Sequence, residues 1–400
     1  MATEDLTRFL AAPAAEWLAD PTIVDTFVDP AGLAQFWLLH YLEALVPQGY
    51  GKVKFVIGEA GTGKSHFLRY LQRRAEAMGY VTVAIDARAH RLSGIDELWR
   101  ALAHSFPWQR TIEERAWRIV RRLYEVSDYQ GSVEEFPAYW AEYTNLDVAR
   151  VRSDLRIETD RWLKTVEINR TFSGVLRQAV MALWRGEGID PVALAWLRGE
   201  RVGAQDRGYL GVSTAVNRRN ARTLLSSLGE WAHAVGRVGL WLCVDNLDVL
   251  TRPRRNSDLP YYTRSQREQA YEMIRELIDD SVHMPYCMAT FAGAAGPLED
   301  TRTGLPSYPA LWSRVESEVR VARHINRWAD LVNLGEAWAS EPDALERLAA
   351  RWQQAPLQWA VGAPEWGGSE LDAGWATPRA RVREVVTMRV SPTAGGISDE

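Results

Sequence analysis

The chain has 400 residues, of which 46% are hydrophobic, enough to build one large domain or two ordinary ones around a real core. Its 47 basic residues are outnumbered by 52 acidic ones, and the net charge of -5 excludes a globally basic surface that would attract nucleic acid, so any such contact has to be local. With two cysteines inside apolar strand-like runs, and no run of about eighteen apolar residues, we expect a cytoplasmic protein without a disulfide, a targeting segment or a membrane partner.

The first predicted strand, at 53–58, runs directly into the glycine-rich sequence GEAGTGKSHF. Its spacing, G-x-x-x-x-G-K-S, is typical of a loop whose backbone N–H groups and following helix hold a chain of phosphates. In that arrangement Lys64 reaches the β- and γ-phosphates of ATP, and the Ser65 hydroxyl ligates Mg²⁺. The segment that this predicts for ATP comprises Gly58, Glu59, Ala60, Gly61, Thr62, Gly63, Lys64, Ser65 and His66.

Three more apolar runs, at 81–86, 238–245 and 286–293, alternate with helical patterns. Runs that are apolar on both faces and are separated by helices predict a parallel sheet covered by helices on both sides. The predicted fold class is therefore α/β, with the parallel sheet of a P-loop NTPase core.

The long stretch between the second and third apolar runs is mostly helical in pattern and exceeds what one crossover helix requires. It therefore predicts a helical insertion within the core. The predicted parts are an N-terminal helical segment at 1–45, the ATPase core at 46–104 and 206–325, the insertion at 105–205, a C-terminal helical lid at 326–390 and a disordered tail at 391–400.

The third predicted strand ends in Asp245, the position from which an acid orients Mg²⁺ in P-loop ATPases. In many ATPases of this class a Glu follows and polarises the attacking water, whereas this chain has Asn246. The amide of Asn246 cannot accept a proton, but it can orient a water. Asp248 lies two residues further on. Three alternatives follow: slow hydrolysis, a base from elsewhere in the chain, or ATP binding as a switch.

A loop with three arginines, Arg252, Arg254 and Arg255, follows this strand. Ring-forming ATPases often project loops from this position toward a central channel, where arginines would bind DNA phosphates without reading sequence. The alternative is a solvated loop flanked by Asp248 and Asp258.

Three further residues are candidates for contacts with the γ-phosphate. Thr290, in the fourth predicted strand, is a candidate for sensing the phosphate or positioning water; it is equally suited to being an ordinary strand residue. Arg314 follows the loop from which ring ATPases often present an arginine to a neighbouring subunit, although a solvated helical arginine has the same appearance. Arg379 opens the last predicted helix, from which it could contact the nucleotide of its own subunit.

Taken in order, several segments resemble the P-loop ATP-binding proteins of bacterial bacteriophage-exclusion (BREX) systems, over about residues 30–390. The phosphate loop is generic, whereas the WLRGE block and the block FAG…GLPSYPAL…R are more specific. The resemblance implies an AAA-type fold, ATP binding with Mg²⁺, and work with other proteins of an anti-phage defence system that acts on DNA.

Two functional hypotheses remain open. The first is a homo-oligomerising ATPase subunit that couples its nucleotide state to double-stranded DNA or to other defence-system proteins, and Arg314 favours it. The second is a signal-transducing NTPase switch or adaptor, in which ATP holds a closed conformation for partner recruitment, and Asn246 favours it.

Overall fold

The computed structural model describes residues 21–126, 129–253, 259–316, 325–341 and 343–354, together with Pro378, Val382 and Val385. A parallel sheet lies at its centre, with the strand order β2-β3-β4-β1-β5. The strands within the described residues are β1 (Lys52–Gly58), β2 (Val81–Asp86), β3 (Leu240–Asp245), β4 (Cys287–Ala294) and β5 (Leu331–Asn333). The predicted α/β fold with the parallel sheet of a P-loop NTPase is confirmed.

The four longer strands coincide with the four predicted apolar runs. β1 and β3 are buried on both faces, which explains why their sequences are continuously apolar rather than alternating. The fifth strand, β5, was not predicted: the region from 326 was expected to be helical, yet Leu331–Asn333 pairs with β1 from Phe55 to Ile57. Three residues are too few to show a strand pattern against the helices around them.

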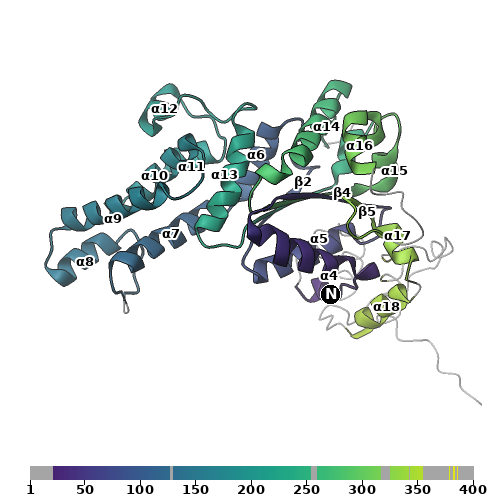
Figure 1. The fold of residues 1–400 in the computed structure, drawn as a ribbon, viewed down its shortest axis with the longest axis horizontal. Coiled ribbons are helices and arrows are strands. Elements are labelled where there is room, and N and C mark those ends of the chain that lie inside the picture. The colour runs from purple at the N-terminus through teal and green to yellow at the C-terminus, as the bar shows by residue number, and fades with distance from the viewer. Residues whose placement is uncertain are drawn as a thin grey trace, which may run out of the picture.

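One face of the sheet is covered by helices from both ends of the chain (Figure 1). Apolar side chains of these helices share one core with Trp241 of β3 and with Met288 and Ala292 of β4. The helical segments on this face are α3 (Pro21–Val24), η1 (Pro30–Gly32), α4 (Leu33–Trp37), the π-helical η2 (Leu38–Leu45), α5 (Lys64–Ala77), α17 (Leu334–Ala339) and α18 (Ala344–Gln354).

The opposite face packs against helices from the middle of the chain, which bury Phe55, Leu242 and Phe291 of the strands. The helices that follow β2, precede β3 or flank β4 are α6 (Ile95–Ser105), α13 (Ala221–Ala234), α14 (Arg264–Asp279), α15 (Ala295–Glu299) and α16 (Pro309–Glu316). A short 3-10 segment, η4 (Leu247–Thr251), leaves the end of β3.

Six further helices project away from the sheet (Figure 1) and are called the helical arm below. They are α7 (Trp108–Leu123), α8 (Phe136–Thr144), α9 (Val148–Leu163), α10 (Arg170–Arg185), α11 (Pro191–Leu197) and α12 (Ala204–Leu210). Side-chain caps fix where three of them begin, since Asp147, Asn169 and Asp190 each accept hydrogen bonds from the first-turn N–H groups of α9, α10 and α11. The apolar residues of the arm belong to the same continuous core as that face of the sheet.

Two findings bear on the sequence-based expectations. Both cysteines, Cys243 and Cys287, are buried and free, as expected for small apolar strand residues. Within the described part of the chain, no helix combines the length and the apolar character that crossing a bilayer would require.

Candidate functional site

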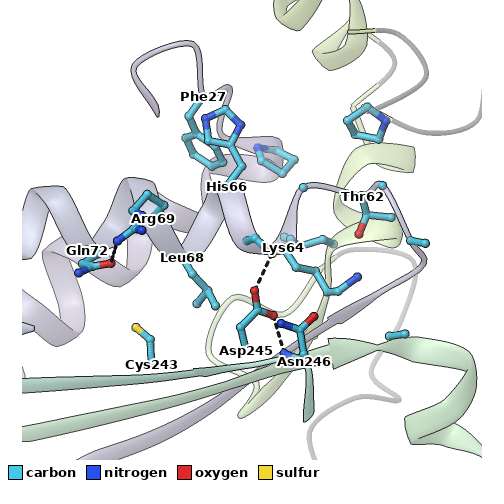
Figure 2. Close-up of a pocket in the computed structure, with 18 of the residues that line it drawn as sticks. Phe27, Thr62, Lys64, His66, Leu68, Arg69, Gln72, Cys243, Asp245 and Asn246 are labelled. Carbon is cyan, nitrogen blue, oxygen red and sulfur yellow. Dashed lines mark hydrogen bonds between the residues drawn. The ribbon is translucent and has the colours of Figure 1, made fainter. Parts of the chain in front are cut away.

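A cavity of about 570 Å³ opens where β1, β2 and β3 end (Figure 2). Carboxyl ends of parallel strands are where open α/β sheets bind ligands, because loops and helix N-termini converge there. Most of the predicted phosphate segment, from Ala60 to His66, lines this cavity, and so do Asp245 and Asn246. The structure thus brings together residues that are about 180 positions apart in the sequence.

The phosphate loop between β1 and α5 needs glycine at particular positions. Gly61 and Gly63 have φ angles of 88° and 89°, in the left-handed region that side chains other than glycine rarely adopt. A Cβ on Gly63 would meet nothing within 4 Å, so the backbone conformation, rather than a lack of space, calls for glycine there. The loop therefore keeps its backbone N–H groups beside an open volume at the start of α5.

Lys64 begins α5 and folds back over the loop. Its Nζ donates to the carbonyl oxygens of Gly58 and Glu59 at 2.8 and 3.0 Å. Burial lowers the pKa of Lys64 from its usual value, although the acidic side chains Asp245, Asp248 and Glu59 oppose that shift. Carbonyl oxygens of its own loop therefore hold the ammonium at the edge of the cavity. An anionic ligand in the cavity would interact favourably with this positive charge.

Ser65 and Asp245 meet directly. The Ser65 hydroxyl donates to Asp245 Oδ2 at 2.6 Å, and the backbone N–H of Asn246 donates to Oδ1 at 2.7 Å (Figure 2 labels Asp245 and Asn246). Burial raises the pKa of the Asp245 carboxyl, while the bonds from Ser65 and Asn246 and the charge of Lys64 act in the opposite direction. The ionised carboxylate is therefore less stable here than in water, and a cation bound beside it would stabilise it.

A second carboxylate, Asp86, stands at the end of β2. It pairs in register with Asp245 and also lines the cavity. Arg88 grips it with Nη2 at 2.7 Å from Oδ2 and Nε at 3.1 Å from each carboxylate oxygen. The Asn246 side chain donates to Asp86 Oδ1 at 3.0 Å, so Asn246 points toward β2.

His66 fastens the segment that precedes the sheet. Its Nε2 lies 3.1 Å from the Val24 carbonyl oxygen, and a carbonyl can only accept, so Nε2 carries the proton. Burial lowers the pKa of His66 to about 4, so the ring is neutral at physiological pH. Phe27 adds an edge contact to the His66 ring (Figure 2). Phe27 also stacks on Tyr70, with 4.5 Å between the ring centroids.

The far side of the cavity is apolar and comes from both ends of the chain. Its walls are Ile23, Phe27, Val28 and Pro30 before the sheet, and Leu334, Trp338, Leu348, Trp352, Pro378 and Val382 after it. The indole N–H of Trp338 donates to the Thr62 carbonyl at 2.9 Å and so ties α17 to the phosphate loop. A cavity with an apolar half and a polar, loop-lined half suits a ligand with an aromatic ring at one end and charge at the other.

Thr290 is placed elsewhere. β4 continues to Ala294, and Thr290 sits four residues before that end, fully buried, with its hydroxyl accepting the Trp241 indole N–H at 3.0 Å. Four strand residues span about 13 Å, and Thr290 does not line the cavity. Of the two alternatives for Thr290, this geometry favours an ordinary packing residue of the strand.

Arg314 and Arg252 also lie outside the cavity lining. Arg314, on α16, is ion-paired with Asp279 of α14, where its Nη2 donates to Asp279 Oδ2 at 2.9 Å. Arg252 is exposed just after η4. Arg254, Arg255 and Arg379 lie outside the described residues, as do the N-terminal residues 1–20 and the predicted tail 391–400.

Sequence reasoning missed two groups of cavity residues. The apolar walls come from segments about 300 positions apart that read only as ordinary helix-packing sequence. Asp86 and Arg88 did leave a signal, because the second predicted strand ends in an acid just as the third one does. Pairing of those two strands would have placed both carboxylates on one edge.

Comparison with known proteins agrees with this geometry. The family model described as "BREX system ATP-binding protein BrxC/D" matches residues 37–339, about three quarters of the chain, and this range includes the phosphate loop, Asp86, Asp245 and the helical arm. No curated protein matches the chain significantly. The chain belongs to the BREX system ATP-binding protein BrxC/D family, whose members are ATP-binding subunits of an anti-phage defence system.

Proposed function

We propose that this chain binds ATP together with Mg²⁺ in the cavity and hydrolyses it slowly. The observation that carries the proposal is the 2.6 Å contact between Ser65 of the phosphate loop and Asp245 of β3, which brings a metal-ligating hydroxyl and a carboxylate to one point. The triphosphate would follow the loop from Gly58 to Ser65, and the base would enter the apolar half between the N-terminal segment and α17 and α18.

The donor set fits Mg²⁺ rather than a metal held by protein alone. Across the described residues, no group of three or more His, Cys, Asp or Glu side chains could hold an ion. Mg²⁺ keeps several waters and is typically bound through one or two protein oxygens plus substrate phosphates, so Ser65 and Asp245 would suffice once a triphosphate is present. The ion would supply positive charge against the phosphates.

Calorimetry on the purified chain, combined with a phosphate-release assay, tests this proposal. We expect ATP binding that requires Mg²⁺ for full affinity, with turnover well below the median enzyme rate of about 10 s⁻¹. Asp245→Ala should abolish turnover. Turnover that is vigorous and unaffected by Asp245→Ala would contradict the assignment of this carboxylate.

Asn246 supports a second candidate function, a nucleotide switch without hydrolysis. The residue that follows Asp245 offers an amide where a proton acceptor is usual, and that amide already bonds Asp86. In the switch, ATP would close the N-terminal segment against α18 for partner recruitment, and Arg351 already contacts the Phe27 carbonyl across that gap. Binding without detectable turnover would favour the switch.

We further propose that ATP promotes self-association and that Arg314 then serves the nucleotide of a neighbouring copy. Arg314 is about one third exposed and is held by Asp279, so it would have to exchange that carboxylate for a phosphate. Size-exclusion chromatography without nucleotide, with ATP and with a non-hydrolysable analogue tests this proposal. A monomer in all three conditions would contradict it.

Double-stranded DNA is proposed as a partner through Arg252, Arg254 and Arg255. Arg252 is exposed, and three arginines would contribute an affinity that falls steeply with salt. Retention of DNA should therefore drop between low and high salt and when all three are changed to Ala. Unchanged retention in either case would rule out this loop.

A further inference from the structure

The end of β2 brings a carboxylate into the cavity beside Asp245. Residues paired in register on parallel strands point to the same face, and Asp86 is in register with Asp245. On this face Thr82, four residues earlier in β2, bonds to Gln72 of α5 at 3.1 Å. Asp86 consequently faces α5 and the phosphate loop, as its place in the cavity lining requires.

Asn246 is built to contact Asp86. Its backbone is left-handed, with φ 61° and ψ 36°, a conformation that Asn adopts more readily than most residues. This turn directs the side-chain amide across to β2, where Nδ2 donates to Asp86 Oδ1 at 3.0 Å. The amide that replaces the usual acid therefore orients another acid.

The other carboxylates that line the cavity from the described residues have different tasks. Asp245 accepts from Ser65 at the proposed metal position. Asp248 accepts the Ala294 N–H at 3.0 Å and so ties η4 to the end of β4. Asp86 is the carboxylate of this set that is bonded to neither the phosphate loop nor the end of β4.

We propose that Asp86 is the catalytic carboxylate that orients the attacking water, in place of the acid absent from position 246. The inference rests on the proposed hydrolysis of ATP. In the step, the water oxygen bonds to the γ-phosphorus as the bond from phosphorus to the β,γ-bridging oxygen breaks. ADP leaves with that electron pair, and the water proton passes to Asp86 Oδ2 and then to solvent.

The electrostatics suit an orienting rather than a strongly basic group. Burial alone would raise the pKa of Asp86, but hydrogen bonds from Arg88 and Asn246 outweigh it and lower the pKa, so the group stays ionised. Phosphoryl transfer passes through a loose transition state, in which positioning the water contributes more than removing its proton early. A weakly basic acid therefore fits slow turnover.

Asp86→Asn is the decisive variant because it keeps the shape and removes the charge. We expect single-site turnover of the full-length chain to fall at least about 100-fold, while the Kd for ATP by calorimetry changes less than about three-fold or tightens, since a negative charge leaves the pocket. The matched control is Asp160→Asn in the arm, where Arg177 grips a carboxylate of similar exposure. Turnover of this control should match that of the unmodified chain.

Several results would overturn the inference. Turnover of Asp86→Asn within about three-fold of the unmodified chain would do so, and so would a parallel loss of ATP affinity and thermal stability, which a structural role would cause. If Asp86→Asn does not fold, Asp86→Glu keeps the charge and should retain at least about a tenth of the turnover, and less than that also counts against Asp86. Absence of turnover in the unmodified chain would instead contradict the proposed hydrolysis itself, which separates the two failures.

Discussion

The cavity and the helical arm both bury charge, but they use it differently. In the arm, Glu158 is 1% exposed and is paired with Arg122 and Arg161, and Arg115 lies 3.7 Å from the Trp162 ring. Protein encloses Glu158 and Arg115, whereas Arg122 and Arg161 keep 64% of their side chains exposed. In the cavity, Lys64 and Asp245 are partly buried, and each borders an open volume. Burial of a charged group is therefore weak evidence for function, whereas burial beside a shaped cavity is stronger evidence.

The largest effect should come from Lys64. Lys64→Ala removes a partly buried cation from the side of the cavity where we propose that the phosphates lie. We expect ATP affinity to fall by at least about 100-fold, since removing one partner of a charge pair that binding desolvates costs about 2–5 kcal/mol. Calorimetry measures this directly. Lys52→Ala is the control, because Lys52 begins β1, the strand that leads into the phosphate loop, but pairs with Asp330 at 2.5 Å, away from the cavity. If Lys64→Ala and Lys52→Ala lost the same ATP affinity, a lysine in the cavity would matter no more than one outside it.

A substitution in the helical arm should lower stability without affecting ATP binding. Burial, together with the charges of Arg118 and Arg122, lowers the pKa of Arg115 to about 10, and the Glu158 carboxylate opposes that shift. Glu158→Gln keeps the shape of the side chain but removes this compensating charge from the buried Arg115. We expect the free energy of unfolding to fall by about 2–3 kcal/mol, with ATP affinity unchanged. Urea titration and calorimetry measure the two quantities.

The control for the arm is an exposed ion pair. Glu187 pairs with Arg185, with 56% and 41% of their side chains exposed, so Glu187→Gln should change stability by less than about 0.5 kcal/mol. If Glu158→Gln weakened ATP binding, the arm would be coupled to the cavity, and the charges of the arm could not be treated as purely structural.

The same contrast separates what the sequence could predict from what it could not. The phosphate loop and the end of β3 are local patterns, because a glycine spacing or an apolar run ending in Asp245 specifies its own geometry. The apolar walls depend on contacts between segments about 300 positions apart, and helical periodicity marks Trp338 and Trp352 only as packing residues. The fourth predicted strand, at 286–293, ends one residue before β4 does, but its sequence could not show that Thr290 bonds the Trp241 indole inside the sheet rather than facing the cavity.

A pH titration tests the contact between His66 and the Val24 carbonyl, which holds the N-terminal segment against α5. An unfolded histidine binds a proton below pH 6.5, whereas His66 in the fold does so only near pH 4. Because the folded pKa is the lower one, the stabilisation is complete above pH 6.5 and is lost as the pH falls toward 4. Between about pH 7.5 and pH 5 the loss should be about 2 kcal/mol.

His66→Gln isolates that contribution, since a Gln amide can still donate to the Val24 carbonyl but does not titrate. Urea titrations of both proteins at the two pH values should show that the unmodified chain loses about 2 kcal/mol more than the variant. Equal losses would mean that His66 is solvated, and that the N-terminal segment does not close this side of the cavity.

The smallest effect concerns Asp245 without ligand. Burial raises the pKa of this carboxyl, so the folded state favours its protonated form, and the ionised group costs stability at neutral pH. Asp245→Asn keeps a partner for the Ser65 hydroxyl and removes the charge, so the Tm measured without nucleotide should rise by about 1–2 °C. The same variant should lose the Mg²⁺ dependence of ATP binding.

Asp160→Asn, which breaks an arm ion pair, should not raise the Tm. A lower Tm for Asp245→Asn would mean that Lys64 already neutralises the carboxylate, whereas a higher one would show that the cavity holds a charge that only its ligand satisfies.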